Sequence, residues 1–249
     1  MSASVLRLAL QKSGRLHDDT MELLAACGVK FSKSSGKLTA RARNFPIEAL
    51  FLRDDDIPGY VADGVAHAGI VGQNVLAEKG AQVHVAQELG FARCRLSVAL
   101  PKDAPYQGPA SLQGLDLATS YPTLLGGWLQ QQGVQAHVHE ISGSVEIAPA
   151  IGLAGGICDL VSTGSTLLSN GLREVEAIFH SQAVLIASQH LPAEQADLLQ
   201  QLQFRMQAVL KAQDYKYIMM NAPNEALPAI SLILHSMKSP TVTPLGIAG

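Results

Sequence analysis

The sequence carries little charge and few aromatic residues. Charged residues make up 16% and aromatic residues 5% of the 249 positions, and 18 Lys and Arg against 21 Asp and Glu give a formal net charge of −3. No cluster of Lys and Arg with interleaved aromatic residues is present. Because nucleic-acid binding depends on a positive field facing the phosphate backbone, we expect no nucleic-acid partner.

Long hydrophobic runs are also missing. No apolar run approaches the roughly 18 residues that a membrane span needs. The apolar patch within residues 1–15 is too short and too interrupted for the core of a signal peptide. We therefore expect a cytoplasmic protein with no membrane-spanning segment.

The three cysteines and eight histidines lack the spacing of a metal site. Cys27, Cys94 and Cys158 form neither a C-x-x-C pair nor a Cys/His set, and no two histidines lie four positions apart with a carboxylate partner. Cysteines with apolar neighbours are usually buried, reduced thiols. We expect free thiols and no zinc.

Strand and helix patterns alternate along the first part of the chain. Hydrophobic residues make up 47% of the sequence and Gly occurs 22 times, which is typical of α/β enzymes. The patterns predict strands at 6–10, 49–53 and 68–71, and a helix at 16–27 that Gly28 ends. Such alternation favours a mostly parallel sheet.

A second unit of the same kind begins near residue 94. The patterns predict strands at 95–100, 115–118, 134–139 and 159–161, a helix that ends at Gly133, and a helix at 145–153. A strand at 181–187 is expected to return to the first unit, ahead of a helix at 194–213.

A chain of this length exceeds one compact core. We therefore expect a hinged, two-lobed α/β body with mostly parallel sheets, similar to the type II periplasmic-binding-protein architecture. Lobe I comprises 1–93 and 180–213, and lobe II comprises 94–179. Residues 214–249 are predicted to add one β-α-β unit, with strands at 217–220 and 241–245 around a helix at 228–234.

The segment 146–167, EIAPAIGLAGGICDLVSTGSTL, has the composition of a phosphate-binding loop. Between a buried strand and a helical stretch lie four hydroxyl-bearing residues: Ser162, Thr163, Ser165 and Thr166. Their hydroxyls and the unpaired backbone N–H groups at a helix start can donate to a phosphate. Gly164 lets the backbone approach the ligand closely.

Two acidic residues make a sugar phosphate a better match than free phosphate. Asp159 directly precedes the loop and Glu146 lies earlier in the segment, and both can accept hydrogen bonds from ribose hydroxyls. Taken alone, Thr-Gly-Ser-Thr is more often a plain loop with a helix cap, so only the longer pattern indicates a sugar-phosphate site.

That longer pattern, E-x5-G-x-A-x2-I-x-D-L-x2-T-G-x-T-L, resembles the signature of the ATP phosphoribosyltransferase family at every fixed position. The resemblance extends from residue 6 to residue 244 and looks most like the long, self-regulated form. It includes QKSGRL (11–16), RDDDIPGYVADGV (53–65), ATSYP (118–122), ISGSVEIAP (141–149), NGLREVE (170–176) and KYIMMNAP (216–223).

The resemblance implies a reaction and its partners. The family joins N1 of the adenine of ATP to C1 of 5-phosphoribosyl-1-pyrophosphate, expels pyrophosphate and uses Mg²⁺, which is the first step of histidine biosynthesis. It also implies a homo-oligomer, a dimer or a hexamer. Long members end in a β-α-β-β-α-β domain that binds histidine, of which 214–249 matches the first half, so histidine feedback is in question.

Departure of pyrophosphate requires cations near the leaving oxygens. Lys12 and Arg15, which flank Gly14, and Arg53 are the candidates, with solvated loop charges or an Arg–Asp surface pair as the alternatives. Tyr121 is expected either to stack on adenine or to pack between the lobes. Magnesium is expected on substrate oxygens and water with at most one or two protein carboxylates, and a direct ligand from Asp55 or Asp56 is the less favoured alternative.

Several positions depart from the family pattern. Gly126, Gly127 and Ala150 stand where many long relatives carry basic residues, and Gly155–Gly156 replace Asp-Ala, at a cost of about 1 kcal/mol for each glycine inside a helix. A catalytically impaired partner protein and a small-anion-binding two-lobed protein therefore remain alternatives. A dinucleotide-binding oxidoreductase is not supported, because G-x-G-x-x-G is absent.

Overall fold

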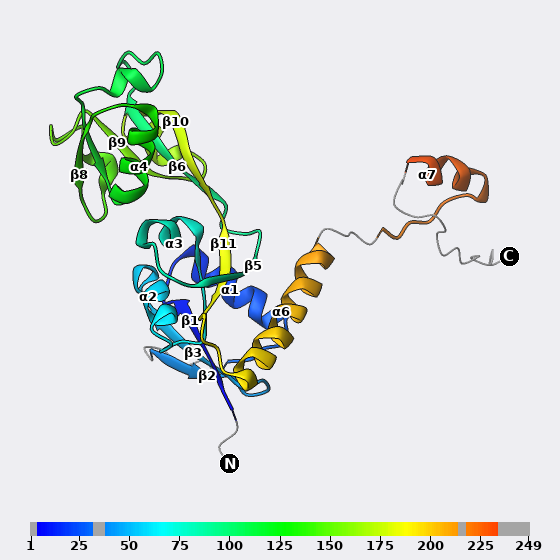
Figure 1. The fold of residues 1–249 in the computed structure, drawn as a ribbon. Coiled ribbons are helices and arrows are strands. Elements are labelled where there is room, and N and C mark those ends of the chain that lie inside the picture. The colour runs from blue at the N-terminus through cyan, green and yellow to red at the C-terminus, as the bar shows by residue number, and fades with distance from the viewer. Residues whose placement is uncertain (1–3, 32–37, 214–217, 234–249) are drawn as a thin grey trace. The chain divides into compact units, whose positions relative to one another are not determined.

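The structure is a computed structural model that describes residues 4–31, 38–213 and 218–233. Its backbone contacts divide the chain into two compact units, Met1–Ala212 and Gln213–Gly249. The first unit contains two β-sheets with their helices (Figure 1). The two units are described separately.

The first sheet has six strands in the order β2-β3-β1-β4-β11-β5. Its strands are β1 (Leu6–Gln11), β2 (Thr39–Arg41), β3 (Ile47–Leu52), β4 (Ala68–Gly72), β5 (His84–Glu88) and β11 (Ala183–Ala187). The central strand β1 pairs in parallel with both β3 and β4, and the other pairs are antiparallel.

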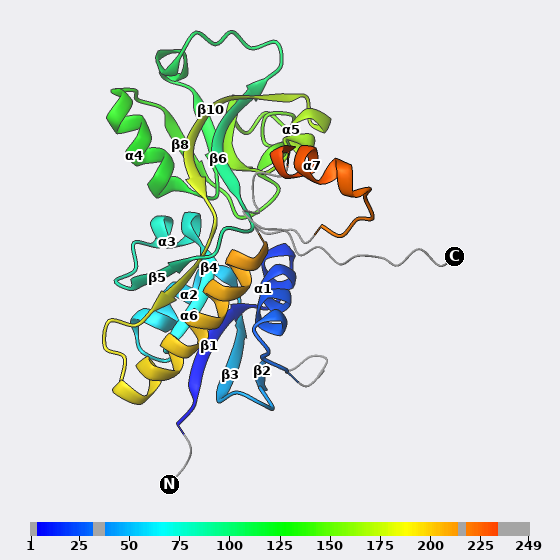
Figure 2. The same ribbon diagram turned by 90° about the vertical axis from the view of Figure 1, so that its right-hand side faces the viewer.

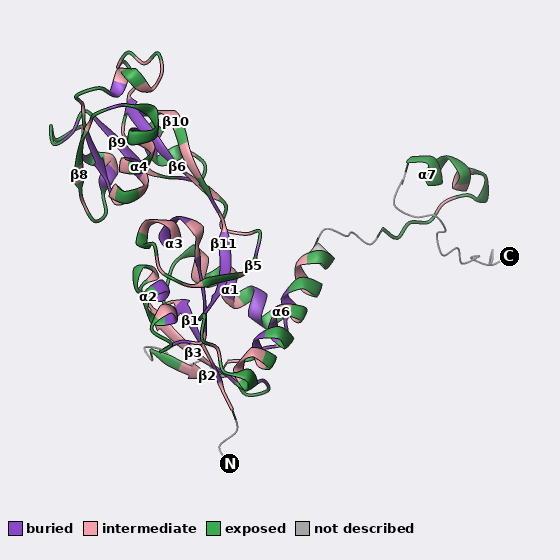
Figure 3. Cartoon of the chain, in the orientation of Figure 1, coloured by how far each residue is buried: buried purple, intermediate pink, exposed green. Residues whose placement is uncertain are grey.

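Helices cover both faces of this sheet. They are α1 (Arg15–Ala26), α2 (Ile57–Ala62), α3 (Gln73–Lys79) and α6 (Ala193–Gln213). Leu8 of β1 belongs to a buried cluster with Leu24 of α1 and Leu202 of α6. Its neighbour Ala9 faces the opposite side, in a cluster with Ile57 of α2. Because successive strand residues point to opposite faces, β1 contributes buried residues to both sides of the sheet, and Figure 3 colours most of this strand as buried.

The second sheet has five strands in the order β10-β6-β9-β7-β8. Its strands are β6 (Cys94–Pro101), β7 (Asp116–Thr119), β8 (His137–Glu140), β9 (Gly156–Val161) and β10 (Leu172–Ser181), and its helices are α4 (Pro122–Gln132) and α5 (Ser165–Ser169). Leu125 and Leu129 of α4 pack with Leu96, Val98 and Leu117 on one face. Val145, Ala148 and Leu167 cover the other face.

The chain passes between the sheets twice, from β5 to β6 and from β10 to β11. The predicted return at 181–187 is confirmed, because β11 pairs with β4. The two-lobed α/β class is therefore correct, but the sheets are mixed rather than mostly parallel. The parallel pairs join β1 to β3 and β4, and β7 to β8 and β9. Strands β6 and β11, which adjoin the passages between the sheets, enter from the other end and pair antiparallel with both of their neighbours. The lobe boundaries at 93 and 180 stay a prediction.

One further expectation needs correction, and one strand was not predicted. Residues 145–153 form a 3₁₀ turn, η3 (Val145–Ile147), followed by turns rather than an α-helix. Gly152 there has a φ of 75°, outside the helical region. The ten-residue edge strand β10 was not predicted, since its charged residues obscure the strand pattern.

In the second unit, α7 (Leu227–Ile233) follows a 3₁₀ turn, η4 (Asn224–Ala226). Residues 218–220, expected in a strand, adopt no regular structure. A strand requires a neighbour to pair with, and the predicted partner at 241–245 lies outside the described residues. Over the whole described chain, the helices are too short or too polar to cross a membrane.

Candidate active site

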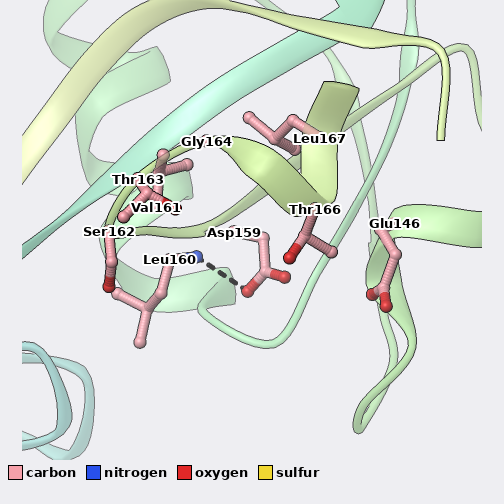
Figure 4. A pocket seen from close by; sticks show the side chains of 9 residues that line it. All are labelled: Glu146, Asp159, Leu160, Val161, Ser162, Thr163, Gly164, Thr166 and Leu167. Carbon is pink, nitrogen blue, oxygen red and sulfur yellow. Dashed lines mark hydrogen bonds between the residues drawn. The ribbon is translucent and has the colours of Figure 1, made fainter. Parts of the chain in front are cut away.

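The predicted phosphate loop lines a pocket of about 250 Å³ (Figure 4). Its lining residues are Glu146, Asp159, Leu160, Val161, Ser162, Thr163, Gly164, Thr166 and Leu167. Strand β9, the middle strand of its sheet, pairs with β6 and β7, and the loop follows its carboxyl end. The ends of strands in such sheets are common ligand sites.

The loop presents polar groups to solvent. Ser162, Thr163, Ser165 and Thr166 are exposed, and the hydroxyls of Thr163 and Ser165 lie 3.1 Å apart. Gly164 has a φ of 80°, a conformation that favours glycine. Since α5 spans only five residues, its dipole is small, and the hydroxyls and backbone N–H groups are the main donors available to a phosphate.

The two predicted acids, Asp159 and Glu146, lie together in the pocket (Figure 4). Burial raises the pKa of the Asp159 carboxyl, and the nearby Glu146 charge raises it further. The Leu160 backbone N–H donates to Asp159 Oδ1 at 2.8 Å and partly opposes that rise in pKa. Most of the oxygen lone pairs of the two carboxylates therefore stay available to hydroxyl donors.

Arg15 meets the phosphate loop from the other sheet. Its Nη2 donates to Ser162 Oγ at 3.1 Å, although the two residues lie 147 positions apart. Arg15 is exposed at the first position of α1, and Gly14 before it has a φ of 97°. The structure thus brings one predicted cation to the predicted anion site.

Lys12 and Arg53 lie at neighbouring strand ends. The parallel register pairs Gln11 of β1 with Leu52 of β3, and each cation directly follows one of these residues. The Lys12 backbone N–H donates to the Leu52 carbonyl at 2.9 Å, and both side chains are exposed. Neither residue lines the described pocket.

A model of the family described as ATP phosphoribosyltransferase matches residues 53–208, and one described as the HisG C-terminal domain matches 212–248. A protein named ATP phosphoribosyltransferase from Cytophaga hutchinsonii is 52% identical over 247 residues, which is 99% of this chain and 86% of that protein. This chain belongs to the ATP phosphoribosyltransferase family. The predicted resemblance is confirmed, and the chain is a transferase.

Solved structures agree with this assignment. The ATP phosphoribosyl transferase (HisG:HisZ) complex from Thermotoga maritima matches with a TM-score of 0.72 and 26% identity, over 83% of this chain and 99% of that one. A substrate-binding protein of an amino acid ABC transporter matches with a TM-score of 0.53 and 10% identity, over 85% of this chain and 96% of that one. The latter likeness shows the predicted two-lobed fold alone.

Tyr121 occupies a half-buried position between β7 and α4. Its hydroxyl accepts a hydrogen bond from Asn74 Nδ2 at 2.9 Å. Burial raises the pKa of Tyr121, and the charges of Asp159, Asp54 and Asp55 raise it further, so the phenol is neutral at physiological pH and lies near these acids. Tyr121 therefore contacts α3 in this ATP phosphoribosyltransferase family member.

The residues that depart from the family pattern are not among those that line the pocket. Gly126 and Gly127 lie within α4, and Ala150 lies in the turn after η3. Gly155 and Gly156 are not helical, which corrects the helix cost assigned to them. A Cβ on Gly156 would lie 2.5 Å from Leu100 Cδ2 and 3.1 Å from the Ala99 carbonyl, so close packing between strands favours glycine there.

Sequence reasoning missed Arg95, which supports the phosphate loop from β6. Its guanidinium pairs with the Glu174 carboxylate of β10, and its Nη1 donates to the Ser162 carbonyl at 3.4 Å. The pairing lowers the pKa of Glu174. No local motif marks Arg95, because its partners lie 67 and 79 positions away.

Proposed function

We propose that this chain transfers the phosphoribosyl group of 5-phosphoribosyl-1-pyrophosphate to N1 of ATP, giving phosphoribosyl-ATP and pyrophosphate, the first step of histidine biosynthesis. The observation that carries the proposal is the pocket that joins the hydroxyl loop to the Asp159–Glu146 pair. A phosphate donor set beside carboxylate acceptors suits a phosphorylated ribose.

Each group has a role in this proposal. Ser162, Thr163, Gly164, Ser165 and Thr166 bind the 5-phosphate through hydroxyls and backbone N–H groups. The carboxylates of Asp159 and Glu146 accept hydrogen bonds from the ribose hydroxyls and hold C1 toward the adenine. Fixed orientation of this kind lowers the barrier to an in-line displacement.

The leaving pyrophosphate needs positive charge more than a base. Arg15, which donates a hydrogen bond to Ser162, is the best-placed cation. Lys12 and Arg53, at neighbouring strand ends, add further positive charge. Tyr121 contributes an aromatic surface to the adenine. Developing negative charge on the pyrophosphate is stabilised by such fixed donors.

Magnesium fits this site as an ion carried by the substrate. Across the described ranges, no group of three or more His, Cys, Asp and Glu side chains is arranged to hold a metal. Pyrophosphate oxygens and water would supply most ligands, with at most one or two carboxylates, and Glu146 and Asp159 are the nearest candidates. When bound, the ion neutralises charge on the pyrophosphate.

The test is direct synthesis. Purified chain is incubated with ATP, 5-phosphoribosyl-1-pyrophosphate and Mg²⁺, and the absorbance of the adduct is followed with and without pyrophosphatase. We expect adduct formation that pyrophosphatase drives forward. Binding of both substrates with no product would favour the catalytically impaired partner, and binding of neither would refute the proposal.

The oligomeric state is also a proposal. A homo-oligomer, at least a dimer, is the state we propose, and light scattering at several protein concentrations tests it. A part in histidine regulation for residues 214–249 stays a prediction, tested by adding histidine to the synthesis assay.

A further inference from the structure

Helix α4 begins without a cap of its own. No side chain at its N-cap residue, Tyr121, caps the helix, and Pro122 at the first position has no N–H. The N–H of Leu125 bonds to the Tyr121 carbonyl at 3.0 Å. The amides of Thr123 and Leu124 therefore need acceptors from elsewhere.

Glu78 of α3 supplies both acceptors. Its Oε1 accepts from Thr123 N at 2.8 Å and its Oε2 from Leu124 N at 2.9 Å. A carboxylate at a helix start also interacts favourably with the helix dipole. Because α3 belongs to the six-stranded sheet and α4 to the five-stranded sheet, this cap joins the two sheets (Figure 2).

A second side chain of α3 holds the same segment. Asn74 lies one helical turn before Glu78, so both project from one face of α3. Its Nδ2 donates to Tyr121 Oη at 2.9 Å, and its Oδ1 accepts from Ser181 Oγ, beside the passage into β11, at 2.7 Å. Asn74 is 5% exposed, and a Cβ on Gly72 would lie 2.3 Å from its Oδ1.

Helix α4 is also intrinsically weak. Gly126 and Gly127 lie in its interior, where glycine disfavours the helix. A helix that is weak and uncapped by its own residues depends more on an external cap. The backbone N–H groups of Thr123 and Leu124 therefore find their acceptors on the other sheet, while the Tyr121 N–H bonds to Thr119 Oγ1 within its own sheet.

We propose that Glu78, with Asn74, is a positioning residue that orders the 121–124 segment and thereby sets the affinity for ATP. The proposal rests on the proposed function in one respect, that Tyr121 contacts the adenine. It adds that the packing of α3 against α4 links the relative position of the two sheets to the contact between Tyr121 and the adenine.

The test is a Glu78→Gln variant of the full chain. Gln keeps the shape, but its Nε2 cannot accept, so one amide loses its acceptor. We expect the dissociation constant for ATP to rise about 5- to 20-fold, the effect of losing a charged cap, and that for 5-phosphoribosyl-1-pyrophosphate to stay within about twofold. Hydrogen exchange in a peptide covering 121–129 should accelerate. Trp128, the only Trp of the chain, lies within α4, and its fluorescence is the signal with which ATP binding is to be followed.

Two variants complete the design. Glu22→Gln, on the exposed face of α1, is the matched control and should change neither constant. Glu78→Asp keeps the charge on a shorter side chain and should fall between wild type and Glu78→Gln. Unchanged ATP affinity in Glu78→Gln, or an equal loss for both substrates, would overturn the proposal. Since binding and exchange are measured rather than turnover, a wild-type chain that binds ATP but forms no adduct would refute the proposed function alone.

Discussion

Replacing Asp159 with Asn should weaken substrate binding while it stabilises the fold. The half-buried Asp159 carboxylate lines the pocket together with Glu146. A charge-assisted hydrogen bond to a ribose hydroxyl contributes about 1.5–3 kcal/mol. Its loss should raise the dissociation constant for 5-phosphoribosyl-1-pyrophosphate about 10- to 150-fold.

Stability should change in the opposite direction. Burial and Glu146 raise the pKa of Asp159 in the folded state. Its contribution to stability is therefore complete below the unfolded pKa, about 4, and is lost as the pH rises through the folded pKa. At pH 7, above the unfolded pKa, the raised pKa of Asp159 lowers the free energy of unfolding. Asn removes that cost while its Oδ1 still accepts from Leu160 N.

The assay pairs calorimetric titration of 5-phosphoribosyl-1-pyrophosphate with urea unfolding at pH 7 and near pH 4. The stability gain of Asp159→Asn should shrink toward the lower pH. Asp103→Asn, at an exposed turn of the same sheet, is the matched control and should leave both measurements unchanged. Unchanged affinity in Asp159→Asn, or a loss of stability at pH 7, would refute the reasoning.

Three further substitutions test other parts of the molecule. Arg15→Ala should lower kcat/KM about 10- to 100-fold, because a charged hydrogen bond to pyrophosphate is lost. The Tm should stay unchanged, since Arg15 is exposed. A fall in Tm alongside the fall in kcat/KM would contradict a catalytic role. Gly127→Ala should stabilise the fold by about 1 kcal/mol and raise the Tm about 2–4 °C, because no atom lies within 4 Å of the added Cβ. An unchanged Tm would argue against an intrinsically weak α4. Gly156→Ala should destabilise by about 1–3 kcal/mol in urea unfolding, since its Cβ would meet Leu100 Cδ2 at 2.5 Å; unchanged stability would show that the strands can separate.

Local sequence patterns predicted the elements whose own residues determine them. Helix α1 was expected from its apolar periodicity and from Gly28, and it spans Arg15–Ala26. The phosphate loop was recognisable because its hydroxyl residues and Gly164 are contiguous. In contrast, the prediction of a helix at 145–153 was wrong, because the apolar periodicity does not reveal that Gly152 has a positive φ, which a helix cannot include.

Elements that depend on partners could not be predicted in this way. Strand β10 mixes charged and apolar residues without strict alternation, and its acidic residues find partners distant in the sequence, Glu174 in Arg95 and Glu176 in Tyr106. The same holds for the direction of β11, which follows from where the chain re-enters the first sheet. Strand pairing is decided by residues distant in the sequence, so local periodicity does not contain it.

The sequence by itself determined the family, the two-lobed α/β class and the contiguous hydroxyl loop with its acids, because each is written in neighbouring residues or fixed spacing. Only the tertiary structure decided which groups meet. It places Arg15 on Ser162 across 147 positions, and the Glu78 carboxylate at the start of α4. Hydrogen bonds of this kind depend on directions and distances of a few ångströms, which two packed sheets fix and a linear sequence does not express.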